Sequence, residues 1–238
     1  MTLSAHQPAY LPWLGYFNKI ARSDVFVILD DVAFEKGSFI NRNRIKTPQG
    51  VQWLTVPVKS HGKPRIKDTA IDGHGWHYKH ITTLHQNYRK SPWYGNYAMF
   101  MDGLICGLVR ETLRDVNYLT AALLQVLGIR PPATVSEGEA SPAIWFQSTE
   151  GVGGAKQDLI LNLCRHFGAD RFLFGSEGRG YADVEWFRKH GVECEFQDYH
   201  TPEYPQLYGE FVPDLSVVDA LFNVGPERTR EMIMGGNR

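Results

Sequence analysis

Residues 1–31, MTLSAHQPAYLPWLGYFNKIARSDVFVILDD, decide the fold of this chain. They predict a short strand over 2–6, a short helix over 13–21 and a second strand that begins at Val25. The second strand is a nearly continuous apolar run rich in β-branched residues, which is typical of a strand buried on both faces of a parallel sheet. A strand, a loop, a helix and a buried strand in this order form a βαβ unit.

Downstream of this unit, QWLTVPV (52–58) is a further predicted strand. Strands and helices alternate again in the last third of the chain. The predicted strands there are AIWFQST (143–149), RFLFGS (171–176) and VECEFQDY (192–199), and the predicted helices are 156–167, 182–190 and LSVVDALFNVG (215–225). Between about 77 and 130, leucines recur at helical spacing. We therefore predict a single α/β domain over 1–238, with a mainly parallel, Rossmann-like sheet and a helical insertion or subdomain in the middle of the chain.

Composition limits the partners and the compartment. The 238 residues carry a formal net charge of −1, so an anion site must be local, and nucleic acid is not an expected partner. No apolar run approaches the roughly 20 residues that cross a bilayer, and the first residues do not read as a signal peptide. Cys106, Cys164 and Cys194 are widely spaced, which favours free thiols in a reducing compartment. We expect a cytoplasmic protein with no membrane span.

The first candidate site is the turn after the first strand. Ligands of open parallel sheets bind beyond the carboxyl ends of the strands, near a topological switch point. His6, Gln7 and Tyr10 follow the first strand, and Pro8 and Pro12 restrict the backbone around them. A rigid loop whose aromatic side chains close the core is the competing interpretation. We expect at least His6 or Gln7 to face a ligand.

The second candidate site is DDVAFEKGSFINRNRIK (30–46), which begins at the end of the second strand. Asp31 lies at the same predicted sheet edge as His6. The cations and amides that follow are Lys36, Asn41, Arg42, Asn43, Arg44 and Lys46. In an extended segment the two asparagines share one face, and the two arginines and Lys46 share the other. Arginine and asparagine give forked hydrogen bonds to phosphate or carboxylate, so we predict a local anion site suited to a nucleotide or a sugar diphosphate; the alternative is a solvated loop with a structural ion pair.

Three further segments carry weaker signals. DGHGWHYKHITTLHQNY (72–88) is rich in histidine, but it lacks an HExxH motif, so we expect no metal; Trp76 and His80 would instead contact sugar. Glycines before Lys156 offer free N–H groups to an anion at a helix start. In FLFGSEGRGYAD (172–183), the side chains at the predicted ligand edge are Ser176, Glu177 and Tyr181. For both glycine-rich turns, the alternative interpretation is that the glycines only shape the backbone and bind no ligand.

Five ordered motifs resemble the WbqC-like protein family over nearly the whole chain. They are HQPAYLPWLGYFNKI (6–20), DDVAFEKGSFINRNRIK (30–46), WLTVPV (53–58), GAKQDLILNLCRHFGADRFLFGSEGRGYAD (154–183) and YPQLYGEFVPDLSVVDALFNVG (204–225). One departure is Ser148-Thr149, where members often carry two serines. The family is associated with bacterial surface-polysaccharide and O-antigen biosynthesis, so the resemblance implies modification of nucleotide-linked sugars, including amino sugars with acyl or aminoacyl groups.

The leading hypothesis is a transferase that moves an acyl or aminoacyl group to the amine of a nucleotide-linked amino sugar. Arg42, Arg44 and Lys156 would hold phosphates, and His6 or Asp31 would remove the amine proton. The co-substrate would be the acyl or aminoacyl donor.

Two alternatives stay open. The opening strand, HxP, helix and buried strand are similar in order to HIGH-type nucleotidylyltransferases, which indicates nucleotidyl transfer or ATP-dependent activation. The other alternative is a non-catalytic nucleotide-sugar-binding accessory protein. The sequence also leaves the oligomeric state open, including a homo-oligomer.

Overall fold

A parallel sheet forms one end of the molecule. A computed structural model describes residues 1–59, 62–108, 112–129 and 144–236. The sheet has five parallel strands in the order β7-β2-β1-β8-β9. Their bounds are β1 Thr2–His6, β2 Val25–Ile28, β7 Ile144–Phe146, β8 Arg171–Phe174 and β9 Glu193–Phe196. The predicted α/β class with a mainly parallel sheet is confirmed.

The strand order places a topological switch point at the centre of this sheet. From β1 the chain moves outward to β2 and β7, and then crosses to the other side of β1 to form β8 and β9. The connections that follow β1 and β8 therefore leave in opposite directions. In doubly wound sheets, this arrangement opens a crevice at the carboxyl ends of the two strands.

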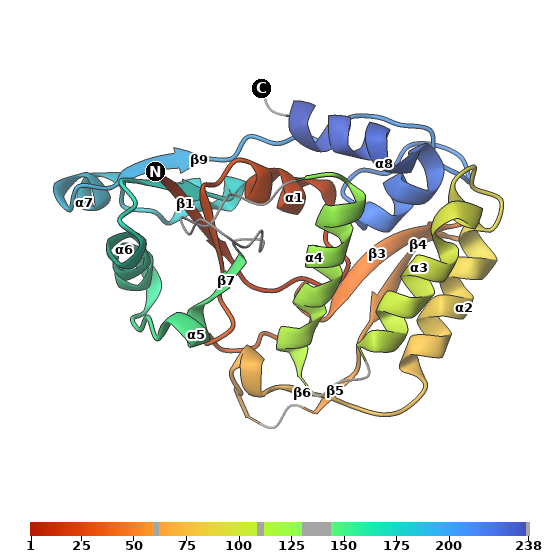
Figure 1. Ribbon diagram of the computed structural model, residues 1–238, viewed down its shortest axis with the longest axis horizontal. Coiled ribbons are helices and arrows are strands. Elements are labelled where there is room, and N and C mark those ends of the chain that lie inside the picture. The colour runs from red at the N-terminus through yellow and green to blue at the C-terminus, as the bar shows by residue number, and fades with distance from the viewer. Residues whose placement is uncertain (60–61, 109–111, 130–143, 237–238) are drawn as a thin grey trace, which may run out of the picture.

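Helices lie on both sides of the sheet (Figure 1). α6 Lys156–Phe167 and α7 Val184–Lys189 lie on one side, and α1 Leu14–Ala21 lies on the other. α5 Gln147–Glu150 follows β7 directly, and α8 Val217–Gly235 packs against α1. Leu3 of β1 and Val27 of β2 pack in one apolar cluster with α6 and α7. Phe26 and Ile28 alternate with them and join a second cluster, which contains α1 and α8.

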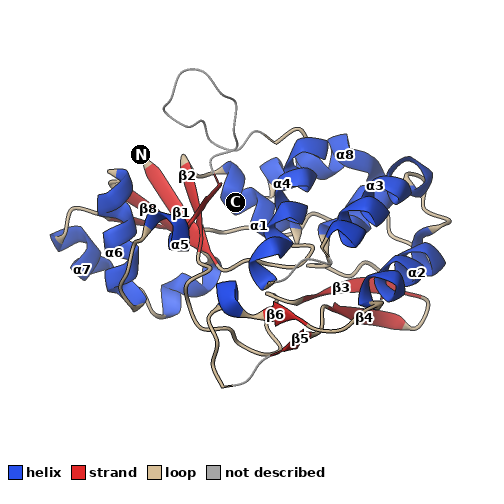
Figure 2. Cartoon of the chain, turned by 60° about the horizontal axis from the view of Figure 1, so that its bottom comes forward, coloured by secondary structure: helices blue, strands red, loops and turns tan. Residues whose placement is uncertain are grey.

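The middle of the chain is only partly helical. It contains α2 Trp76–Tyr88, α3 Tyr94–Gly107 and α4 Asn117–Val126, the hairpin of β3 Arg42–Thr47 with β4 Gly50–Thr55, and the short pair β5 Val58–Lys59 with β6 Ala70–Ile71. Figures 1 and 2 both show the β3–β4 hairpin beside α2. The predicted strand QWLTVPV thus contributes to this antiparallel hairpin and not to the main sheet.

This middle region shares its core with the rest of the protein. Leu84 of α2, Ile105 of α3 and Leu119 of α4 belong to the same buried cluster as Phe17 of α1 and Phe222 of α8. The predicted helical insertion or subdomain is therefore not confirmed as a separate unit. Within the described ranges, no helix combines the length and the apolar character needed to cross a membrane.

Candidate functional site

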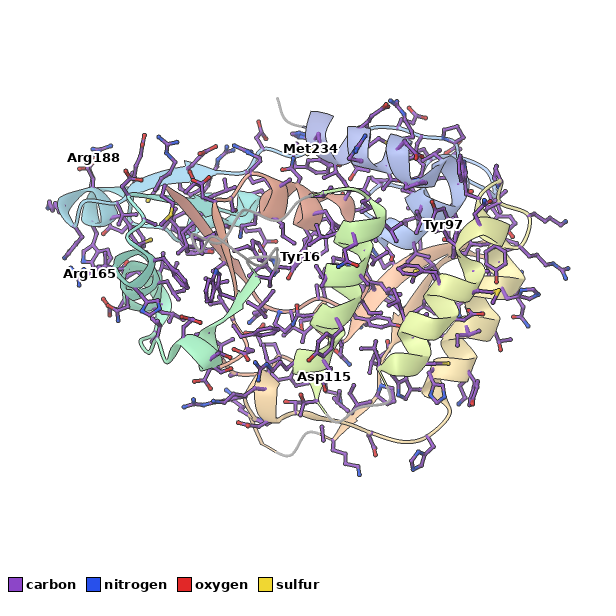
Figure 3. All side chains as sticks on the ribbon, viewed as in Figure 1. Tyr16, Tyr97, Asp115, Arg165, Arg188 and Met234 are labelled. Carbon is purple, nitrogen blue, oxygen red and sulfur yellow. The ribbon has the colours of Figure 1, made fainter. Side chains whose placement is uncertain are left out.

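A cavity of about 610 Å³ opens where the carboxyl ends of β1 and β8 diverge. We call it the switch-point cavity. Its lining includes His6, Gln7, Trp13, Tyr16, Lys19, Phe39, Arg44, Ser176, Glu177, Tyr181, Gln197 and Tyr199. Figure 3 shows Tyr16 near the centre of the molecule, between the parallel sheet and the helical half, whereas Arg165 and Arg188 lie at the far end. The cavity therefore brings the strand ends and the middle region together.

His6 presents one free ring nitrogen in this cavity. Its Nδ1 lies 2.8 Å from the carbonyl oxygen of Gln7. Because a carbonyl only accepts, the neutral ring carries its proton on Nδ1 and keeps a lone pair on Nε2. Among the described residues, none forms a hydrogen bond with Nε2. The ring is held edge-on against Tyr16, with centroids 4.9 Å apart.

The environment of His6 keeps its ring neutral. The pKa of His6 is lowered to about 4, mainly by burial and in part by the positive charge of Lys19, while the hydrogen bond to Gln7 opposes the shift. An imidazole with this pKa is unprotonated throughout the neutral range. It is thus available as a proton acceptor, although as a weaker base than a free histidine.

Lys19 is a cation of the cavity that the sequence analysis missed. It comes from α1, is only 4% exposed, and its Nζ donates to the carbonyl oxygen of Ala5 at 2.9 Å. No carboxylate of the described chain forms an ion pair with it. Burial lowers the pKa of Lys19 to about 7, so both protonation states are populated near neutral pH. The available signal was a lysine between Phe17 and Ile20 on an apolar helix, a position that faces the core.

The β3–β4 hairpin carries the predicted cations on one face. Arg44 lines the cavity, and its Nη2 donates to the carbonyl oxygen of Asp214 at 2.9 Å. The guanidinium of Arg42 lies 4.1 Å above the ring of Trp53. Asn41 and Asn43 are buried, and their amides donate to the backbone oxygens of Val56 and Leu11. The predicted alternation of faces is therefore present, and the asparagines hold the neighbouring loops.

The loop after β8 brings three more predicted side chains to the cavity. Ser176, Glu177 and Tyr181 line it, from a short 3-10 helix and the residue that follows. Gly178 lets this loop lie against β8, because a Cβ there would be 2.6 Å from Cβ of Phe174. A larger residue at this position would push the loop away from the strand.

Asp31 is placed elsewhere, as part of a surface ion-pair cluster. Its carboxylate lies 2.6 Å from Arg65 Nη1 and 2.8 Å from Lys67 Nζ. Burial alone would raise the pKa of Asp31, but the hydrogen bonds from Lys67 and Arg65 outweigh it and hold the pKa below its usual value. Lys36 and Lys156 are exposed and do not line the cavity either.

Tyr10, Trp76 and His80 form a separate buried cluster. The Tyr10 hydroxyl lies 2.8 Å from His80 Nδ1, and Tyr10 is fully buried. Burial lowers the pKa of His80 to about 4, although a hydrogen bond with the Thr55 backbone opposes the shift. Trp76 and His80 also line a groove of about 760 Å³ between β4 and α2, but Trp76 is only 5% exposed. The structure thus separates Tyr10 from His6 and Gln7.

Ser148 and Thr149 are tied to a buried carboxylate beside the cavity. Asp30 follows β2, is fully buried, and accepts hydrogen bonds from the Ser148 amide at 2.9 Å and from the Ser148 hydroxyl. Arg114 approaches Asp30 at 3.3 Å and donates to the Thr149 hydroxyl at 3.1 Å. The hydroxyl of Ser148 is therefore bonded to Asp30 and that of Thr149 to Arg114. The contact between Ser148 and Asp30 holds α5 against the end of β2.

Together, the strand order and the polar crevice define a Rossmann-like α/β protein with its cavity at the switch point of a parallel sheet. The model of the WbqC-like protein family matches residues 7–231. An uncharacterised protein of Mycobacterium tuberculosis is 35% identical over 229 residues, which cover 93% of each chain. The chain belongs to the WbqC-like protein family. No solved structure matches it.

Proposed function

We propose that this protein is an enzyme of bacterial surface-polysaccharide biosynthesis that transfers an acyl or aminoacyl group to the amine of a nucleotide-linked amino sugar. The observation that supports the proposal most is His6, whose Nε2 lone pair is free in the switch-point cavity while Nδ1 is fixed by Gln7. Lys19 and Arg44 place positive charge in the same cavity, where the ligand would carry its negative charge.

The proposed step is nucleophilic substitution at the donor carbonyl. The amine nitrogen attacks the carbonyl carbon of an activated acyl donor, and a C–N bond forms. The bond from that carbon to the leaving group breaks, and the leaving group departs with the electron pair. The proton lost by the amine passes to Nε2 of His6, which is neutral at cytoplasmic pH because of its lowered pKa.

Replacement of His6 tests this role. His6→Gln should lower kcat by about 10²–10⁴-fold, the range of general acid–base catalysis, while the nucleotide sugar still binds. Purified protein would be incubated with a UDP- or dTDP-linked 4-amino sugar and an activated acyl donor, and mass spectrometry would detect the acylated product. His166→Gln is the matched control, since His166 lies on α6 and pairs with Glu150 outside the cavity. An unchanged kcat in His6→Gln would rule out His6 as the general base.

Nucleotidyl transfer or ATP-dependent activation is the second candidate. It is favoured by the position of His6 at the carboxyl end of the central strand β1 and before α1, where a histidine stabilises phosphate charge in HIGH-type nucleotidylyltransferases. Release of pyrophosphate or AMP from ATP, only when an acid or a sugar phosphate is present, would favour it over acyl transfer. Binding of the nucleotide sugar with no turnover of any donor would instead indicate an accessory protein.

A further inference from the structure

The outer face of the β3–β4 hairpin presents aromatic and cationic side chains together. The strand register pairs Arg44 with Trp53 and Arg42 with Thr55, so these side chains share a face. Phe39, from the loop before β3, lies beside Trp53 with ring centroids 5.7 Å apart. We call Phe39, Arg42, Arg44 and Trp53 the hairpin platform.

The aromatic rings of the platform are exposed. Trp53 is 41% exposed and Phe39 is 36% exposed, although both are large apolar side chains. Large aromatic rings usually bury more of their surface unless a partner covers them. A planar ring of a ligand would recover this surface by stacking.

The platform continues into the switch-point cavity. Phe39 and Arg44 line the cavity as well as belonging to the platform. The Phe39 ring lies 5.2 Å from Trp13, and the Trp13 ring lies 5.8 Å from His6. A row of aromatic side chains thus leads from the free nitrogen of His6 to the exposed face of Trp53.

The arginines of the platform have unused hydrogen-bond donors. The guanidinium of Arg42 stacks on Trp53 and forms no hydrogen bond or ion pair with any described residue. Among the described residues, the guanidinium of Arg44 donates only to the Asp214 carbonyl, and the Nε atoms of both arginines are buried without a partner. A guanidinium has five N–H donors, so two of them on one strand face leave many donors for an external anion. Both guanidinium groups lie over the Trp53 ring, 4.1 and 5.9 Å from its centroid, so they are close enough to each other to bind one diphosphate.

From these contacts we infer that the hairpin platform binds the nucleoside diphosphate part of the substrate. The base stacks on Trp53 and Phe39, Arg42 and Arg44 hold the phosphates, and the sugar extends along Trp13 towards His6. The identity of this ligand as a nucleotide-linked sugar rests on the proposed function. The platform is a single short hairpin in a chain of net charge −1, so it fits one nucleotide and not a nucleic-acid strand.

Calorimetric titration with UDP, dTDP, uridine and pyrophosphate tests the platform. Trp53→Ala should weaken UDP binding at least ten-fold and leave pyrophosphate binding within two-fold of wild type, because only the stacked base is lost. Arg42→Gln should weaken both UDP and pyrophosphate binding at least ten-fold. Tyr118→Ala and Arg165→Gln are matched controls, since both side chains are exposed and neither lines the cavity. Trp53→Phe should bind UDP nearly as wild type, which guards against a folding defect in Trp53→Ala.

The outcomes separate this inference from the proposed function. If Trp53→Ala and Arg42→Gln bind UDP and dTDP within two-fold of wild type, the platform is not the nucleotide site, whether or not acyl transfer occurs. If UDP binding depends on the platform but no amino sugar is acylated, the inference stands and the proposed reaction is wrong. If the wild-type protein binds neither nucleotide at millimolar concentration, both are wrong.

Discussion

Two ionisable side chains in the switch-point cavity lose part of their usual charge through burial. The pKa of His6 is lowered to about 4 and that of Lys19 to about 7. A positive charge on Lys19 disfavours protonation of His6, because both charged groups would be positive and poorly solvated. An anionic ligand would favour the protonated form of Lys19, so binding and the charge of the cavity are coupled.

This coupling predicts a bell-shaped pH profile of kcat/KM for the free enzyme. Activity should fall below about pH 4, where His6 becomes protonated, and above about pH 7, where Lys19 loses its charge. Lys19→Arg should move the alkaline limb to higher pH, because a guanidinium stays protonated. Lys19→Met should lower kcat/KM below about pH 7, where the wild-type lysine is charged, and should remove the alkaline limb. An alkaline limb that stays near pH 7 in Lys19→Arg would contradict the role of this lysine.

At the residue scale, the sequence predicts side chains that directly follow a strand better than those on distant elements. His6, Gln7, Ser176 and Glu177 line the cavity because the carboxyl ends of parallel strands meet at one edge. The partners of Asp31 are Arg65 and Lys67, in a loop whose position no local pattern predicts. Lys19 was missed because its role depends on burial beside His6, which is a tertiary property.

At the scale of elements, apolar strands were predictable and the polar strand β3 was not. RFLF is a short apolar run and forms β8, and ECEF, where charged and apolar residues alternate, forms β9; both lie within the predicted segments. The strand β3, RNRIKT, has no alternation of apolar and polar residues. On its inner face, Asn43 lies beside Ile45 and donates to the backbone oxygen of Leu11, and hydrophobic periodicity does not detect a buried amide of this kind.

The kink in α8 depends on one glycine. Gly225 has a φ of 78°, and a Cβ there would lie 2.5 Å from the Trp93 ring. We expect Gly225→Ala to lower the free energy of unfolding by about 2–4 kcal/mol, because the backbone is strained and the indole must move. Gly235→Ala, near the end of the same helix with open space around it, should change it by less than about 0.5 kcal/mol. Urea unfolding of both variants measures the difference, and equal effects would contradict it.

At the scale of the whole molecule, burial lowers the pKa of two histidines, His6 and His80. His6 lies in the cavity and His80 lies against Tyr10, and burial lowers the pKa of each to about 4. In the unfolded chain both would titrate near pH 6.5. Between pH 6.5 and 4 the unfolded chain therefore binds more protons than the folded protein, and stability falls as the pH falls.

This difference predicts acid sensitivity of the whole fold. From pH 7 to pH 5, each buried histidine should lower the free energy of unfolding by about 2 kcal/mol. His80→Gln should reduce the change in the free energy of unfolding between pH 7 and pH 5 by about half, regardless of how stable the variant is at pH 7. His166→Gln should retain it, because His166 is exposed. Chemical denaturation at the two pH values is the measurement, and an unchanged pH dependence in His80→Gln would contradict the prediction.

The position of β1 at the centre of the sheet has a consequence for synthesis on the ribosome. Its neighbour β2, Val25–Ile28, follows early in the chain, but its other neighbour, β8, spans Arg171–Phe174. Until that segment emerges, one edge of β1 stays unpaired and open to wrong partners. The loop after β8 lines the switch-point cavity, so a nascent chain that stops before β8 lacks one wall of this cavity.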